Sequence, residues 1–163
     1  MADQFEISDE MKTQVGWESS PWRFEVTTTS VRAFARGVGY TDPVYYDLDT
    51  AKKAGYRSLP APPTYPGTPV FMPGKTDDTF SHPIDARPDI KHGLTGLLDG
   101  GTETEYFDTI CAGDILTVIT KLKNLEVKDS KNLGKMLIIT TETSFKNQEG
   151  KLVAVQRGQG IYY

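Results

Sequence analysis

The chain has very few of the residues that build disulfide or metal frameworks. Its 163 residues include one cysteine, Cys111, and two histidines, His82 and His92. A single cysteine excludes an intramolecular disulfide and fits a reducing compartment, so we expect a cytoplasmic protein. One cysteine and two histidines in dissimilar surroundings do not supply the ligands of a usual zinc site, so we expect no metal.

Membrane and nucleic-acid signals are also missing. No window approaches the ~20 apolar residues of a membrane span, and the N-terminal run MADQFEISDEMK lacks the apolar core of a signal peptide. The net charge of −4 argues against an unaided nucleic-acid or anionic-membrane surface. No dinucleotide-binding, P-loop or serine-elbow spacing occurs. These absences leave an ordinary soluble globular chain, which we expect to form one domain over residues 1–163.

The C-terminal part of the sequence lacks proline. All ten prolines lie at or before Pro88, and the chain beyond Gly100 is rich in Thr, Val, Ile and Tyr, which favour strands. Turn signals at residues 129–134 and 147–150 separate the last three apolar segments, so we expect an antiparallel meander. Together with an alternating pattern at residues 21–26, the predicted strands cover residues 102–110, 115–127, 135–147 and 152–163.

Helices are expected only in the N-terminal part. Val31, Phe34, Ala35 and Val38 form one apolar stripe with helical spacing and are expected to be buried. Hydroxyl residues at 27–30 can cap this helix, and Gly37 and Gly39 end it. A second short helix is predicted at residues 51–54 with Asp49 or Thr50 as its cap, and a third at Asp9 behind Ser8, with Phe5, Ile7, Met11 and Val15 facing the core.

Several motifs occur in a fixed order. They are GYTDPVYYD at residues 39–47, AKKAGY at 51–56, APPT at 61–64, LDGGTE at 98–103 and AGDIL at 112–116. This order resembles the MaoC-like dehydratases, in particular their N-terminal-type, FAS1-like dehydratase branch, from about Ile7 to the end of the chain. The resemblance implies an α+β hot-dog fold, an antiparallel sheet wrapped around a central helix that would begin near residues 68–72. It also implies acyl-thioester substrates such as acyl-CoA, with no further cofactor, and leans toward bulky acyl groups, including steroid side chains.

Hydration of an α,β-unsaturated thioester needs a base for water, an acid for Cα and donors to the enolate oxygen. The resemblance assigns the first two tasks to an aspartate and a histidine. Tyr40 and Tyr45 occupy those two positions here, and Asp42 replaces an asparagine. Tyrosine, with a free pKa near ~10, is a poor base at neutral pH. We therefore expect a subunit without the usual dyad that shapes the acyl pocket, with a second hot-dog chain as its partner.

Three residues are candidates for catalysis within this chain, each with a simpler alternative. Asp42 can act as a base or cap a turn. His92 lies near the Asp99 motif, although a solvated loop histidine is the simpler reading, as it is for His82. Asp99 can approach a ligand because glycines follow it, or accept a local hydrogen bond in a turn. The candidate substrate-binding residues are Tyr40, Tyr45, Pro62 and Gly100, and simple packing is the alternative for the tyrosines.

Five basic residues near the expected pocket mouth are candidates to bind the coenzyme A phosphates, and a solvated charged surface is the alternative for each. They are Lys52, Lys53, Arg57, Lys75 and Arg87. Two other functions remain open. One is a non-catalytic acyl-thioester binding or scaffold protein, and the other is an active homo-oligomeric hydratase with a rewired site. Because a sheet of this kind leaves an open edge and an apolar face, a dimer or a larger assembly is expected in each case.

Overall fold

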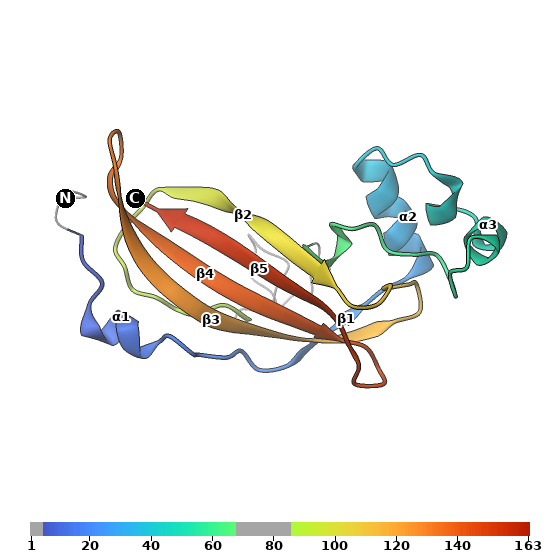
Figure 1. The fold of residues 1–163 in the computed structure, drawn as a ribbon, viewed down its shortest axis with the longest axis horizontal. Coiled ribbons are helices and arrows are strands. Elements are labelled where there is room, and N and C mark those ends of the chain that lie inside the picture. The colour runs from blue at the N-terminus through green and yellow to red at the C-terminus, as the bar shows by residue number, and fades with distance from the viewer. Residues whose placement is uncertain (1–4, 68–85) are drawn as a thin grey trace.

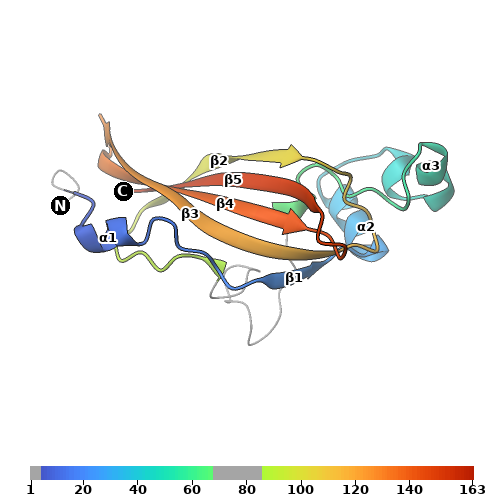
Figure 2. The same ribbon diagram turned by 60° about the horizontal axis from the view of Figure 1, so that its bottom comes forward.

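The computed structural model describes residues 5–67 and 86–163. A long, twisted antiparallel sheet forms the body of the molecule, with strand order β1-β3-β4-β5-β2 (Figure 1). Helix α1 and the C-terminal end of β5 lie at one end of the sheet, and helices α2 and α3 lie at the opposite end in both views (Figure 2). The strands are β1 (Trp22–Glu25), β2 (Leu97–Tyr106), β3 (Ile115–Ser130), β4 (Gly134–Lys146) and β5 (Leu152–Tyr162).

Strands β3, β4 and β5 form the predicted meander. The β4–β5 connection is closed by hydrogen bonds from Gly150 N–H to the Asn147 carbonyl and from Asn147 N–H to the Lys151 carbonyl, both 2.9 Å long. Gly134 and Gly150 adopt positive φ angles of 72° and 78° at the two hairpins, a conformation that glycine tolerates without strain. The turn residues therefore fix the register of the three strands, as expected.

Strand β2 differs from the prediction. It begins at Leu97 rather than at residue 102 and ends at Tyr106 rather than at residue 110. The Gly100-Gly101 pair does not interrupt the strand, because Gly100 is the unpaired residue of a bulge and pairing with β5 continues on both sides, with Gly101 at φ 105°. Beyond Tyr106, the N–H groups of Phe107 and Asp108 both donate to the Val153 carbonyl, which turns the chain away from the ladder.

The principal helix, α2 (Thr28–Gly37), has the predicted cap. Thr27 and Ser30 form a reciprocal capping box, and Val31 and Ala35 are fully buried. Phe34 packs partly buried against the core. The expectation that Val38 is buried is wrong, since Val38 is 49% exposed. The helix ends at Gly37, and Val38, with ψ near 1°, leaves the helical stripe.

The short helices follow local capping chemistry. In α3 (Leu48–Lys53), Asp47 is the cap rather than Asp49 or Thr50, because its Oδ1 accepts both the N–H and the hydroxyl of Thr50 at 2.8 and 2.7 Å. Helix α1 (Asp9–Thr13) has the predicted Ser8 cap. Phe5, Ile7 and Met11 pack in the core as expected, but Val15, beyond the helix end, is 44% exposed. Short 3₁₀ turns also lie in the described N-terminal part, at η2 (Pro43–Tyr45) and η3 (Tyr65–Gly67).

One face of the sheet, here called the inner face, carries the apolar core. Buried and partly buried residues alternate along β3 from Ile115 to Leu122, and the buried ones share the inner face. Two separate apolar clusters cover it. One contains Phe24, Val31, Leu59, Tyr65, Leu116, Val118 and Phe145, and the other contains Met11, Leu122, Leu137 and Ile139, with Ile90, Leu94 and Tyr162 against it.

An ion pair ties the segment after α3 to the start of β3. Asp114 is 3% exposed, and its Oδ2 accepts from Arg57 Nη2 at 2.5 Å and from the Cys111 N–H at 2.9 Å. Arg57 also donates to the Thr109 carbonyl at 3.1 Å. This contact, the Arg57–Asp114 latch, holds the 59–63 segment against residues 110–112, where Ala61 N–H donates to the Ile110 carbonyl at 2.8 Å.

Three expectations fall outside the described residues: the start of a central helix at residues 68–72, the position of His82 and the role of Lys75. Within residues 5–67 and 86–163, no helix is both long and apolar enough to span a bilayer.

The latch generates a stability prediction. Replacing Arg57 with Met leaves the buried Asp114 carboxylate without its cation, which we expect to lower the free energy of unfolding by about 2 kcal/mol. This is less than the ~3–5 kcal/mol of a fully buried pair, because the Arg57 side chain is 49% exposed. Urea denaturation measures the change. The matched control is Lys151→Met, which breaks the solvent-exposed pair with Asp108 and is expected to cost at most ~1 kcal/mol. Equal losses in the two variants would contradict the latch.

Candidate functional site

Three tyrosines fix the loop between α2 and α3. The rings of Tyr40 and Tyr45 stack with centroids 5.6 Å apart and planes 25° apart. The Tyr46 hydroxyl donates to the Tyr40 carbonyl at 2.5 Å, and the Tyr46 carbonyl accepts from Arg32 Nε at 2.9 Å. Tyr40 and Tyr45 are therefore in contact with each other, in the loop at the helical end of the molecule.

The protonation state of Tyr45 does not favour a role as a general base. Burial raises the pKa of Tyr45 above its ordinary value, and the neighbouring Tyr40, Asp42 and Tyr56 raise it further. A raised phenol pKa keeps the hydroxyl protonated at neutral pH. Tyr45 can therefore donate a hydrogen bond to a ligand but is not poised to take a proton from water.

Asp42 has a local structural task. It is the N-cap of η2, and its Oδ1 accepts from the Val44 N–H at 3.0 Å. The side chain is exposed, so its second oxygen is open to water. The capping alternative therefore accounts for the position of this carboxylate without a catalytic role.

His92 lies at the other end of the sheet. Its ring packs on Tyr162 with centroids 4.3 Å apart, and its Nδ1 accepts from the Leu94 N–H at 3.1 Å. Burial lowers the pKa of His92 below its ordinary value, so the ring is neutral at pH 7. With Nδ1 accepting, the proton of the neutral ring sits on Nε2, which leaves a hydrogen-bond donor rather than a free base.

Asp99 and Gly100 lie on the edge strand β2. Asp99 Oδ1 accepts from the Gly101 N–H at 2.9 Å. This is a local hydrogen bond of the kind expected from the structural alternative for Asp99. Gly100 passes so close to β5 that a Cβ would lie 2.9 Å from the Gln159 carbonyl oxygen. Only glycine fits this approach, so strand packing explains the glycine at this position without contact with a ligand.

The sheet separates these candidates into two groups. Asp99 pairs with Gly160 and Tyr106 pairs with Ala154, so six residue steps of extended strand, about 20 Å, separate these two positions of β2. Asp99 lies near the start of β2, and the ring of His92 packs on Tyr162 at the end of β5. Both strand ends lie toward α1, whereas Asp42, Tyr40 and Tyr45 belong to the connection between α2 and α3 at the opposite end (Figure 1). Within the described residues, the candidate catalytic residues do not form one constellation.

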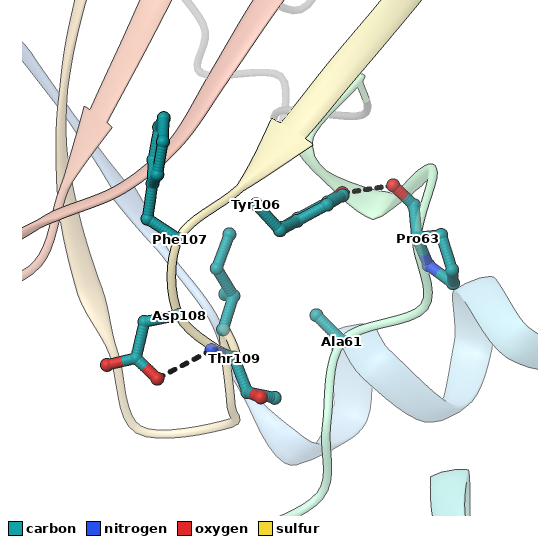
Figure 3. Close-up of a pocket in the computed structure, with 7 residues that line it drawn as sticks. Ala61, Pro63, Tyr106, Phe107, Asp108 and Thr109 are labelled. Atoms are coloured by element: carbon teal, nitrogen blue, oxygen red, sulfur yellow. Dashed lines mark hydrogen bonds between the residues drawn. The ribbon is translucent and has the colours of Figure 1, made fainter.

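One hollow lies where the end of β2 meets the APPT segment (Figure 3). It has a volume of about 460 Å³ and is lined by residues 61, 63 and 106–110. Tyr106 points toward Pro63 and donates to its carbonyl, and burial raises the pKa of Tyr106 to about 12. Pro62 itself is buried beneath this surface, so its neighbours Ala61 and Pro63, rather than Pro62, form the wall.

A second hollow of about 570 Å³ lies on the inner face between the two apolar clusters. Its lining combines residues 86–89 with side chains from β3, β4 and β5, namely Thr120, Ile139, Thr141, Thr143, Gln156, Gly160 and Tyr162. The sequence analysis missed these residues. The only local signal is that Thr141 and Thr143 share a parity in β4, and their meeting with Thr120 and Gln156 depends on the register of three strands.

The basic candidates are dispersed. Lys52 and Lys53 lie in the last turn of α3, where they complement the helix dipole. Arg57 is held in the latch, Arg87 lines the inner-face hollow, and Lys75 falls outside the described residues. Within the part of the chain that the structure describes, no group of three or more His, Cys, Asp or Glu residues is placed to hold a metal ion.

Comparison with known proteins identifies the family. Residues 13–156 match the family described as FAS1-like, dehydratase domain region. The chain is 29% identical over 133 residues to a UPF0336 protein of Thermobifida fusca, a match that covers 82% of this chain and 80% of the relative. It is 26% identical over 143 residues to a probable enoyl-CoA hydratase alpha subunit of Thermomonospora curvata, covering 81% of this chain but 43% of that longer protein.

The solved structures agree on the fold. The C-terminally truncated HadBC (3R-hydroxyacyl-ACP dehydratase) complex of Mycobacterium tuberculosis superposes with a TM-score of 0.68 at 23% identity, covering 96% of this chain and 99% of the matched chain. The predicted α+β hot-dog fold is thereby confirmed. The order of motifs, the antiparallel sheet and the match over residues 13–156 show that this chain belongs to the FAS1-like dehydratase branch of the MaoC-like hot-dog dehydratases.

Proposed function

We propose that this chain is one subunit of an acyl-CoA hydratase or 3-hydroxyacyl-thioester dehydratase, the half that holds the acyl group while a second hot-dog chain supplies the catalytic Asp and His. One observation carries the proposal. Two tyrosines that stack on each other occupy both dyad positions, and burial raises the pKa of one of them. The complex named in the HadBC structure and the alpha subunit named in Thermomonospora curvata support the assignment to a multi-subunit enzyme.

The chemistry explains why a partner is needed. In hydration, a base takes a proton from water, and the water oxygen bonds to Cβ of the enoyl thioester. The Cα=Cβ electron pair moves toward the thioester oxygen as an enolate, which is then protonated at Cα. Protonated phenols at Tyr40 and Tyr45 can donate hydrogen bonds but do not begin this sequence. The reaction needs no cofactor beyond the thioester itself.

The edge strand β2 is the surface that we assign to the partner. It is the outermost strand beside β5 and is exposed along nearly its whole length, so its outer backbone groups can pair with another strand. Leu97 and Leu98, 52% and 44% exposed, add apolar surface at one end, and Tyr106 and Phe107 do so at the other. Such an edge favours a dimer or a larger assembly in the cytoplasm.

The two rival functions have less support. A rewired active site would need to join Asp42 with His92 or Asp99, but these lie at opposite ends of the sheet, and Asp42 and Asp99 each accept a local backbone hydrogen bond. The other rival, a binding protein without any catalytic partner, would explain the pockets equally well. Hydratase activity of the reconstituted complex distinguishes the proposed subunit from such a binding protein.

The test is a steady-state hydratase assay of the complex reconstituted with a partner that carries the intact dyad. We expect Tyr40→Phe and Tyr45→Phe to leave kcat within about tenfold of the unmodified complex, because no essential proton passes through these hydroxyls. As a control, replacing the partner's dyad histidine with Ala should lower kcat by at least ~100-fold. A loss of that size in either tyrosine variant, at an unchanged melting temperature, would make the tyrosine catalytic and refute the proposal.

A second prediction separates capping from catalysis at Asp42. Asn caps as well as Asp, so Asp42→Asn should keep both stability and turnover. Asp42→Ala removes the acceptor for the Val44 N–H and should cost up to about 1 kcal/mol of stability, while kcat of the complex survives. Thermal unfolding and the hydratase assay on both variants measure the two effects. If Asp42→Asn alone reduces kcat by ~100-fold with no change in melting temperature, Asp42 is a general base.

A further inference from the structure

The inner face of the sheet is interrupted by a polar band. Cross-strand partners share a face, so the pairing of β2, β5, β4 and β3 places Thr104, Gln156, Thr143 and Thr120 in one row. The next row contains Thr102, Gly158, Thr141 and Leu122. These rows lie between the two apolar clusters, at the level where a sheet core is normally apolar.

Glycines hollow out this band. Gly158 and Gly160 leave β5 without side chains on the inner face opposite Thr141 and Ile139. A Cβ at Gly158 would lie 3.7 Å from the Thr141 hydroxyl, an ordinary contact, so the backbone is not crowded there. The result is the hollow of about 570 Å³, with Tyr162 and Ile139 forming an apolar wall at one end and threonines at the other.

The polar groups of the band have spare hydrogen-bonding capacity. Thr120 and Thr143 join their hydroxyls at 3.0 Å, which uses one of their two protons. Gln156 Nε2 donates to Thr104 Oγ1 at 3.2 Å, which leaves the Gln156 carbonyl oxygen as an acceptor. Among the hydrogen bonds of the described residues, none involves the Thr141 hydroxyl. The hollow therefore presents at least one free donor and one free acceptor to whatever occupies it.

The groups that face the hollow from the sheet are neutral. They are threonine hydroxyls and the Gln156 amide, with Ile139 and Tyr162 beside them, so they suit a ligand oxygen that carries no charge. Charged residues of both signs lie at the rim, where Arg87 and Asp89 line the hollow and Asp89 pairs with Lys91 at 2.7 Å.

We propose that this inner-face pocket binds an acyl group that carries a neutral oxygen, a hydroxyl or a ketone, away from the thioester, with Thr141, Thr143 and Gln156 as the residues that recognise that oxygen. The hydrocarbon part of the acyl group lies against Ile139 and Tyr162. A saturated alkyl chain fits less well. It removes the hydrogen bonds that the hydroxyl and amide groups make to water and offers no hydrogen bond in their place. This inference rests on the proposed function, since it assumes that the ligand is an acyl thioester.

Calorimetric binding of saturated thioesters, which cannot be hydrated, tests the pocket. The full-length chain, alone and in the reconstituted complex, is titrated with dodecanoyl-CoA and with a panel of hydroxydodecanoyl-CoA isomers whose hydroxyl lies at positions from C6 to C12. We expect at least one isomer to bind about tenfold more tightly than dodecanoyl-CoA, the effect of one net hydrogen bond. Thr141→Val should reduce this preference to less than threefold and leave the affinity for dodecanoyl-CoA within about twofold.

Thr140→Val is the matched control. Thr140 neighbours Thr141 in β4 but points to the opposite face, so this variant should keep the full preference. If no isomer binds more tightly than dodecanoyl-CoA, or if Thr141→Val and Thr140→Val behave alike, the inference is wrong while the hydratase proposal stands.

The free hydroxydodecanoic acids are titrated in parallel. If they bind with the same Thr141 dependence and the thioesters do not, the pocket is confirmed and the thioester function is lost. If neither thioesters nor acids bind, the inference is overturned.

Discussion

The antiparallel register of β3, β4 and β5 is the constraint on which the rest of the molecule depends. A shift by one residue would exchange the inner and outer faces of a strand. In the observed register, Val118 and Phe145 meet in one apolar cluster, and the Glu142 and Arg157 side chains meet on the opposite face, where Arg157 Nε donates to Glu142 at 3.0 Å. The same register brings Thr120, Thr143 and Gln156 into one row. The core, the charged face and the polar pocket are therefore consequences of one alignment.

The helical end is attached to this sheet by a small number of specific contacts. The Arg57–Asp114 latch and the backbone bonds between residues 59–61 and 110–112 hold the APPT segment beside the end of β2. Tyr106 reaches across to the Pro63 carbonyl and closes the hollow there. The loop that carries Tyr40 and Tyr45 lies at this end, where the stacked rings and the hydrogen bond from Tyr46 to the Tyr40 carbonyl fix it. The proposed division of labour between two hot-dog chains is consistent with this arrangement, because a protonated phenol does not act as a base.

Local patterns predicted much of this fold. The alternating pattern at residues 21–26, the stripe of Val31 and Ala35 and the turn residues of both hairpins each depend on near neighbours, and the structure confirms them. Predictions failed where a single capping contact or bulge decided the outcome. Asp47 rather than Asp49 caps α3 because it accepts from both donors of Thr50, and the Gly100-Gly101 pair forms a bulge inside β2 instead of preceding the strand.

The candidate site was harder to predict, for a physical reason. The family motif located Tyr40 and Tyr45 together, and their stacking lies within a few residues of chain. His92 and Asp99 were grouped with the site because they are near each other in sequence. The start of β2, which contains Asp99, and the end of β5, on which His92 packs, lie at the opposite end of the sheet from α2 and α3. The pocket of Thr120, Thr141 and Gln156 joins three strands, and no local pattern encodes such a row.

The central claim is that this chain binds the thioester but does not itself perform proton transfer. The most direct measurement is the hydration rate of crotonyl-CoA and of a longer, branched enoyl-CoA by the isolated chain, with binding of the same acyl groups followed as saturated thioesters. The account predicts measurable binding and a hydration rate indistinguishable from that in buffer. Efficient turnover of either substrate, abolished by Tyr40→Phe or Tyr45→Phe, would contradict it.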